Sequence, residues 1–297
     1  MDNKLNKTFY DIQKLDSAAA EQYPRFVSID HKIEITPQKG NSFITKNNEF
    51  VWRARVNFPD LERFMLLSTN LFIPETGRLF IYAADNHKML CSVGPEANDT
   101  NKFYNTGPLN VNDIIIEYNE KLLPDKKVRG IFGFNRVSIF FRNGDESGTS
   151  LDCNKNVNCN PLHDELCHEI RSAVKIYIHL TWEEGPHNGV GTFTYCSGGL
   201  VNNSNDDLRP LIVSARHCVQ DDKDQDGDRY VIDHPELWVV YYDFQSPVCG
   251  PTTMGNDRMT TVGVNELGTD FCSDLLTLEV TANAGYSLAS QFSIIII

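Results

Sequence analysis

Short runs of strand-forming residues, separated by polar turns, occupy most of the first half of the chain. We predict strands at residues 50–56, 64–73, 78–83, 88–93, 113–118 and 128–141. Turn residues such as those at 74–77 separate the runs, and short strands with polar turns at regular spacing are typical of a β-sandwich or jelly roll. We therefore predict a β-sandwich over residues 46–143, preceded by a polar segment at 1–45.

The second half begins after small polar residues without periodicity at 144–152, which predict a linker. A short helix is predicted at 164–174, followed by strands at 175–182, 190–201, 210–214, 237–244, 259–264 and 275–280. Several strands with little helix are typical of a small antiparallel barrel. The predicted fold class is all-β, with the sandwich followed by a barrel domain over residues 153–297.

Composition limits the possible partners. A chain of 297 residues can form two domains that each bury a core. Its formal net charge of -13 argues against nucleic acid and against an anionic membrane surface as partners. No apolar segment is long enough to span a membrane. We expect a monomer that binds neither nucleic acid nor a membrane.

The eight cysteines indicate an oxidising compartment. All except Cys91 lie between Cys153 and Cys272, and clustered cysteines in a β-rich domain are more often disulfides than thiols. We therefore expect a secreted protein, although residues 1–10 contain no secretory signal, which we attribute to an incomplete N-terminus. Zinc is the alternative at His163, Cys167 and His168, but their spacing matches no standard ligand pattern.

Two motifs carry the candidate chemistry. Cys196-Ser-Gly-Gly-Leu200 lies in a predicted strand, and Ser214-Ala-Arg-His217-Cys218 follows it. A disulfide from Cys196 to Cys218 would fix the loop that carries His217, and a general base needs a fixed imidazole. Asp274 directly precedes the last predicted strand, and histidine before aspartate is the chain order of the chymotrypsin-type triad.

A serine to complete such a triad is not evident. No Gly-Asp-Ser-Gly follows Asp274. The linker segment Gly144-Asp-Glu-Ser147-Gly148 resembles that motif but has one extra residue between the glycine and the serine. It also precedes His217, whereas the serine loop should follow Asp274, so we assign Ser147 no role.

With these motifs, residues 153–280 resemble the trypsin-like serine proteases, most closely the secreted bacterial lysyl endopeptidases. Further matching segments are 153–159, 238–246 with Cys249, and 273–279. The resemblance implies that His217 is the general base and that Asp274 holds its tautomer. It also implies disulfides that join Cys196 to Cys218 and Cys159 to Cys249.

The remaining cysteines fit the family less well. Cys153 would pair with a cysteine in a C-terminal part of the family's domain that this chain lacks. Cys91, Cys167 and Cys272 match no cysteine of the family, and we expect them to be free.

In this family a second barrel supplies the nucleophilic serine, and it should lie beyond residue 297. We therefore predict a C-terminally truncated zymogen of a serine endopeptidase, which acts on polypeptide substrates when complete and is inactive as this chain. The alternative is a non-catalytic protease homologue that acts as a secreted binding module. A serine loop in the downstream reading frame would favour the enzyme.

An acidic loop is a candidate calcium site. Residues 222–228 have the Asp-x-Asp-x-Asp-Gly spacing of calcium loops, and Asp233 lies where the closing carboxylate is expected. No flanking helices are evident, and we favour a solvated acidic insertion. We expect no other cofactor.

Overall fold

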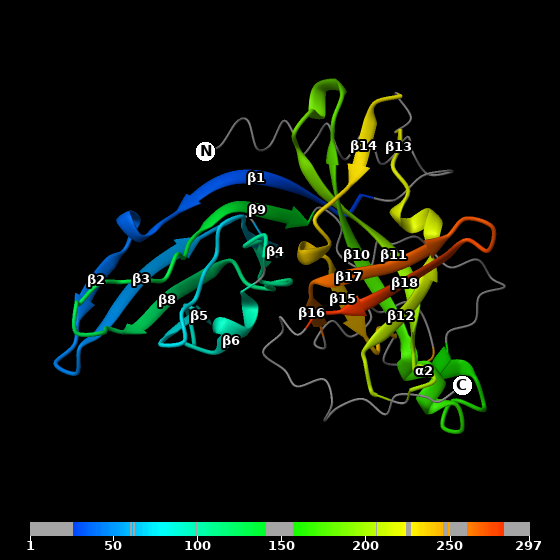
Figure 1. The fold of residues 1–297 in the computed structure, drawn as a ribbon, viewed down its shortest axis with the longest axis horizontal. Helices are drawn as coiled ribbons and strands as arrows, with labels where there is room; N and C mark the ends of the chain where they lie inside the picture. The colour runs from blue at the N-terminus through cyan, green and yellow to red at the C-terminus, as the bar shows by residue number, and fades with distance from the viewer. Residues whose placement is uncertain are drawn as a thin grey trace.

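The structure, a computed structural model, describes residues 26–140 and 157–281. Within these ranges, residues 60, 62, 99, 206, 224–226, 246–248 and 250–259 and the side chain of His168 are not described. The predicted linker, Ser147 and Cys153 lie outside the described residues. The described chain is nearly all β, in three antiparallel sheets, which confirms the predicted all-β class (Figure 1).

Two of the sheets form a sandwich. The first has the strand order β1 (Ser28–Ile35), β9 (Phe134–Phe140), β4 (Phe64–Ser68) and β7 (Tyr104–Asn105). The second has the order β2 (Asn41–Ile44), β3 (Glu49–Asn57), β8 (Asp113–Lys121), β5 (Gly77–Ala83) and β6 (Met89–Val93). Trp52, Phe64 and Ile116 belong to the core that fills the space between the two sheets. Short 3-10 turns, η1 (Pro37–Lys39) and η2 (Pro95–Ala97), lie in the connections.

Strands β1 and β2 lie before residue 46, in the part for which the sequence predicted only a polar segment. Charged residues such as Asp30 and Lys32 interrupt the apolar positions of β1. Every residue of β2 is exposed, and its pairing with β3 runs through the backbone. In β1 these charged residues alternate with Ile29, Ile33 and Ile35, which is the pattern of a half-buried strand, and the prediction overlooked it. β2 shows no such pattern of burial.

The sheet that contains β4 is covered on both faces. Phe64 and Leu66 enter the sandwich core, whereas Met65 and Leu67 enter a second core with Phe193 of the barrel domain. The four β4 residues are fully buried. An unbroken apolar run is typical of a strand that is buried on both sides.

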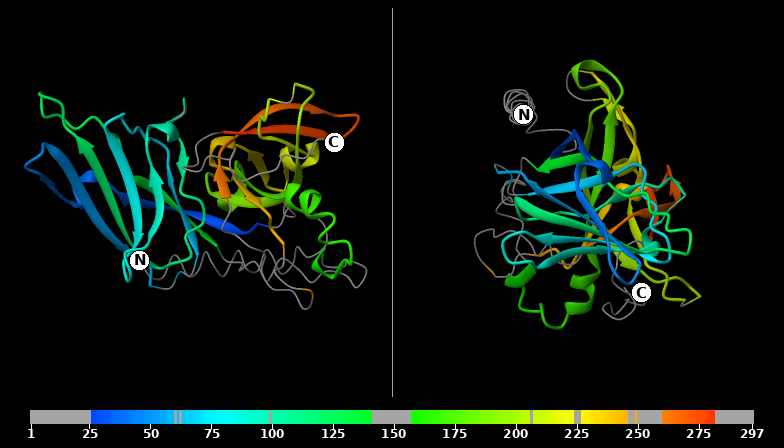
Figure 2. Two further views of the ribbon diagram at one scale, coloured as in Figure 1. Left: turned by 90° about the horizontal axis from the view of Figure 1, so that it is seen from below. Right: turned by 90° about the vertical axis from the view of Figure 1, so that its left-hand side faces the viewer.

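The third sheet curls into a barrel that lies beside the sandwich (Figures 1 and 2). Its main path is β13 (Asp222–Lys223), β14 (Arg229–Ile232), β10 (Ala173–Trp182), β11 (Gly191–Val201), β12 (Leu211–Ala215), β18 (Leu275–Val280) and β17 (Val264–Asp270). β15 (Val239–Tyr242) pairs with β10 and with β16 (Thr260–Val262). Gly263, with φ of +89°, bends the chain from β16 into β17, so the sheet turns back on itself.

Apolar side chains fill the barrel, among them Ile176, Val240 and Leu278. The helical elements of this part are short: η4 (Val157–Cys159), α2 (Cys167–Ser172), η5 (Gly185–His187), η6 (Arg216–Val219) and η7 (Pro235–Leu237). No described helix combines the length and the apolar character that a membrane crossing requires.

We expect Leu66→Ala and Leu67→Ala to lower the free energy of unfolding by similar amounts, about 2–5 kcal/mol each, because each removes buried methyl groups from a different core. Urea unfolding would measure both. Leu123→Ala, at a side chain that is 46% exposed, is the control and should cost below about 1 kcal/mol. A cost for Leu67→Ala as small as that of the control would show that the barrel-facing side of the sheet is open to water.

Candidate active site

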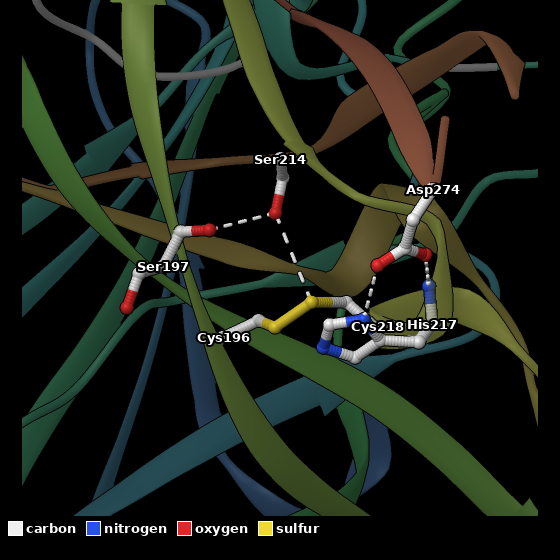
Figure 3. The surroundings of a disulfide bond; sticks show 6 residues. All are labelled: Cys196, Ser197, Ser214, His217, Cys218 and Asp274. Carbon is white, nitrogen blue, oxygen red and sulfur yellow. Dashed lines mark hydrogen bonds and ion pairs between the residues drawn. A yellow bond between two sulfur atoms is a disulfide. The ribbon is translucent and has the colours of Figure 1, made fainter. Parts of the chain in front are cut away.

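The two predicted site residues meet at the end of a strand ladder. β12 pairs with β18 up to Ala215 and Leu275, and the backbone N–H of Arg216 donates to the carbonyl of Asp274 at 2.8 Å. The carboxylate of Asp274 then makes two contacts with His217. Oδ1 accepts the backbone N–H at 2.9 Å, and Oδ2 lies 2.6 Å from the ring Nδ1 (Figure 3).

Asp274 adopts a backbone conformation that suits this contact. It ends the turn between β17 and β18 with φ of +51°, in the left-handed region that aspartate tolerates better than most residues. Asp270 supports the same turn, because its Oδ1 accepts the backbone N–H groups of Cys272 at 2.7 Å and Ser273 at 3.1 Å. The turn therefore presents the carboxylate to η6.

A disulfide fixes the other side of the contact. Cys196, in the middle of β11, is bonded to Cys218 in η6, with their Cα atoms 6.1 Å apart. Cys218 is buried in the barrel core, and Cys196 packs against it. The residue after His217 is thus anchored covalently, and the structure confirms this expected disulfide.

Exposure and charge suit a group that meets a reactant from solvent. The side chain of His217 is 68% exposed and that of Asp274 is 50% exposed. The hydrogen bond from the His217 ring, and next the bond from its backbone N–H, lower the pKa of Asp274 below its ordinary value. Asp274 therefore remains a carboxylate at neutral pH and orients the ring by accepting from Nδ1–H.

The other ring nitrogen is available. No described side chain forms a hydrogen bond with Nε2 of His217. Ser214, the serine in the same motif, donates instead to the carbonyl of Ser197 at 2.7 Å, and its oxygen lies 3.8 Å from Sγ of Cys218 (Figure 3). Ser214 is therefore engaged with the strand and is not positioned as a nucleophile.

Two residues that support the site were not predicted from the sequence. The guanidinium of Arg216 lies over the ring of Phe271, 4.7 Å from its centroid, so the exposed tip of the β17–β18 hairpin rests on η6. Phe271 is 77% exposed. An apolar residue at a hairpin tip, next to a candidate site, is the signal that could have indicated this contact.

The second expected disulfide, between Cys159 and Cys249, is also present, with Cα atoms 4.8 Å apart. Cys91, Cys167 and Cys272 are free cysteines, as expected. His163 lies beside Asp164, with Nδ1 and Oδ1 3.1 Å apart. The proposed zinc trio cannot be completed here, because the side chain of His168 is not described.

One cluster of ligand-type atoms is found among the described residues. Sulfur atoms of Cys196 and Cys218 and a ring nitrogen of His217 lie within 4.8 Å of one another. The two sulfurs are joined as a disulfide, so they are not the thiolates that bind zinc.

The candidate calcium loop, for which the sequence favoured a solvated acidic insertion, is described only in part, since residues 224–226 lie outside the described chain. Asp222 and Lys223 form β13, which pairs with β14. Asp233, predicted to close the loop, instead forms a hydrogen bond with the ring of His179. Burial opposes ionisation of Asp233, but the bond to His179 lowers its pKa below the ordinary value.

Taken together, fold and site define a β-barrel protein with an oriented, solvent-accessible histidine of the kind that hydrolases use as a base. Residues 147–291 match the family model of the lysyl endopeptidase C-terminal domain. This match supports a lysyl endopeptidase-like protease family for the chain.

We expect Asp274→Asn to move the proton of neutral His217 from Nδ1 to Nε2. The amide oxygen would accept the backbone N–H of His217 in place of Oδ1, and the amide NH₂ in place of Oδ2 would donate to an unprotonated Nδ1. Nitrogen-15 NMR of the imidazole ring would report the tautomer. Glu279→Gln, on the same strand but paired with Arg209, is the control and should leave it unchanged. Retention of the Nδ1–H form in Asp274→Asn would show that the carboxylate does not set the tautomer.

Proposed function

We propose that the chain is a secreted serine endopeptidase precursor in which His217 is the general base and Asp274 its orienting carboxylate. The observation that supports this most strongly is the two-point contact between them, on an exposed loop held by the Cys196–Cys218 disulfide. The match to the lysyl endopeptidase domain supports the protease class. The name of that domain suggests cleavage after lysine in a polypeptide substrate. The two disulfides agree with secretion.

The proposed chemistry follows from the ring orientation. With Nδ1–H donating to Asp274, Nε2 carries the lone pair, and because the side chain is 68% exposed a nucleophile hydroxyl can approach the ring and donate to it. As the hydroxyl attacks the peptide carbonyl, Nε2 takes its proton, and the Asp274 carboxylate stabilises the imidazolium. The imidazolium then returns the proton to the leaving amine.

No described hydroxyl forms a hydrogen bond with Nε2 of His217, and no Gly-Asp-Ser-Gly follows Asp274 in the sequence. We therefore propose that a polypeptide of residues 1–297 supplies the base and its orienting group but not the serine nucleophile that acyl transfer needs.

A fluorophosphonate probe tests both parts of this proposal. We expect purified residues 1–297 to remain unlabelled and not to cleave a lysine-containing peptide. Labelling that disappears in His217→Ala but persists in His187→Ala would contradict the expected inactivity while supporting His217 as the base. Labelling that persists in His217→Ala would contradict the assignment of the base.

The proposed endopeptidase activity is tested with the protein as its own cells produce it. There, we expect His217→Ala to lower kcat/KM for peptide hydrolysis about 10⁴-fold. The control, His187→Ala, alters a histidine in η5 and should have no such effect. Equal activity of the two variants would contradict the proposed function.

A further inference from the structure

A second histidine lies completely buried between the sandwich and the barrel. His179, on β10, has no exposed surface. Its Nδ1 forms a hydrogen bond with Oδ1 of Asp233, which follows β14 in the barrel domain. Its Nε2 lies 3.2 Å from Oδ2 of Asp30, which belongs to β1 of the sandwich. One imidazole therefore connects the two parts of the molecule through two carboxylates.

This arrangement requires a charged ring. A neutral imidazole has one N–H, so it can donate to one carboxylate only, whereas the imidazolium donates to both. Burial by itself lowers the pKa of His179, but the hydrogen bonds to Asp233 and Asp30 raise it to about 9. The ring is therefore protonated at neutral pH.

Few other charges face this group. Arg136 of β9 lies 3.8 Å from the same oxygen of Asp30, and His234, before η7, lies 3.7 Å from Asp233. β11 contributes uncharged neighbours, the ring of Phe193 and the backbone of Gly191. His31 follows Asp30 and so points to the opposite face of β1, toward the sandwich core. Glu236 acts on His234 rather than on the His179 ring.

Asp30 depends on this contact. Its side chain is 3% exposed, and its Oδ1 is buried without a hydrogen-bond partner among the described residues. If His179 loses its proton, Asp30 retains only the longer contact to Arg136 as charge compensation. A buried carboxylate left in that state strongly disfavours the contact between the two parts.

The surrounding interface is built for close approach. A Cβ added at Gly191 would lie 2.5 Å from Oδ2 of Asp30 and 2.7 Å from Nε2 of His179. The N–H of Val27 donates to the carbonyl of Phe193 at 2.8 Å, and Asn105 donates to the carbonyl of Leu237 at 2.8 Å. Met65 and Leu67 lie in the shared apolar core.

We propose that the sandwich is a docking module for the barrel, and that the His179 imidazolium is the pH-dependent part of their contact. The module stays bound without a covalent connection after the chain is cut within residues 144–152, and it is released at alkaline pH. The direction of this pH dependence follows from the proton on His179. The docked form requires protonated His179, so docking is fully supported below the ordinary histidine pKa of 6.5 and weakens as pH rises through about 9.

The test uses the full chain with a recognition sequence for a site-specific protease in place of residues 144–152. After cleavage, analytical ultracentrifugation gives the dissociation constant of the two fragments between pH 6 and pH 10, while circular dichroism reports whether both remain folded. We expect the fragments to sediment together at pH 6–7 and the dissociation constant to rise about 30-fold or more by pH 10.

The variant Asp30→Asn distinguishes an effect of the His179 proton from an effect of apolar packing between the two parts. An amide can donate to an unprotonated Nε2 while Nδ1–H donates to Asp233, so this variant needs no extra proton. We expect its dissociation constant to change less than about threefold over the same pH range. The matched control, Asp113→Asn, removes a surface ion pair with Arg55 within the sandwich and should retain the pH dependence of the unmodified chain.

A dissociation constant of the unmodified fragments that is independent of pH, or an equal pH dependence in Asp30→Asn, would overturn the proposal. Should the fragments unfold at high pH, nitrogen-15 NMR of the intact chain at pH 7 decides the matter. Protons on both ring nitrogens of His179 would support the proposed imidazolium contact, and a neutral ring would exclude it.

Discussion

Alternate side chains of β4 enter two different hydrophobic cores, and this double burial couples the parts of the molecule. Phe64 and Leu66 belong to the sandwich, while Met65 and Leu67 belong to the core shared with the barrel. A sheet with one face in water tolerates unpaired polar residues there, whereas a polar residue on this sheet needs a partner, as Asn105 has in the carbonyl of Leu237. The barrel surface therefore contributes to the stability of the sandwich, and the sandwich in turn covers apolar residues of the barrel.

The position of the candidate site follows from strand register. The ladder between β12 and β18 ends at Ala215 and Leu275, and its next step joins Arg216 to Asp274. A shift of one residue in either strand would turn every side chain to the opposite face and would separate His217 from its carboxylate. The Cys196–Cys218 disulfide adds a covalent constraint to the same register, since it ties β11 to η6.

The sequence predicted what depends on local pattern. The last strand is found at Leu275–Val280, as predicted, and the contact between His217 and Asp274 was expected from motif order. Long-range effects were not predictable. Asp30 lies in a segment predicted only as polar, and its contact with His179, 149 residues away in the sequence, could not be read from local pattern. Likewise, the acidic spacing at residues 222–228 made calcium a candidate ligand, and nothing in that spacing indicated that Asp233 contacts His179.

Two of the described histidines, His217 and His179, form hydrogen bonds with aspartates that lie far from them in the sequence, and their surroundings assign them different roles. A general base needs one nitrogen that is oriented and another that is free to take a proton. His217 meets both conditions, because Asp274 holds Nδ1 and the ring is largely exposed. His179 fails the second condition, because carboxylates occupy both nitrogens and no solvent reaches it. The same pair of residue types therefore provides a reactive group at an exposed loop and a charged connection at a buried interface.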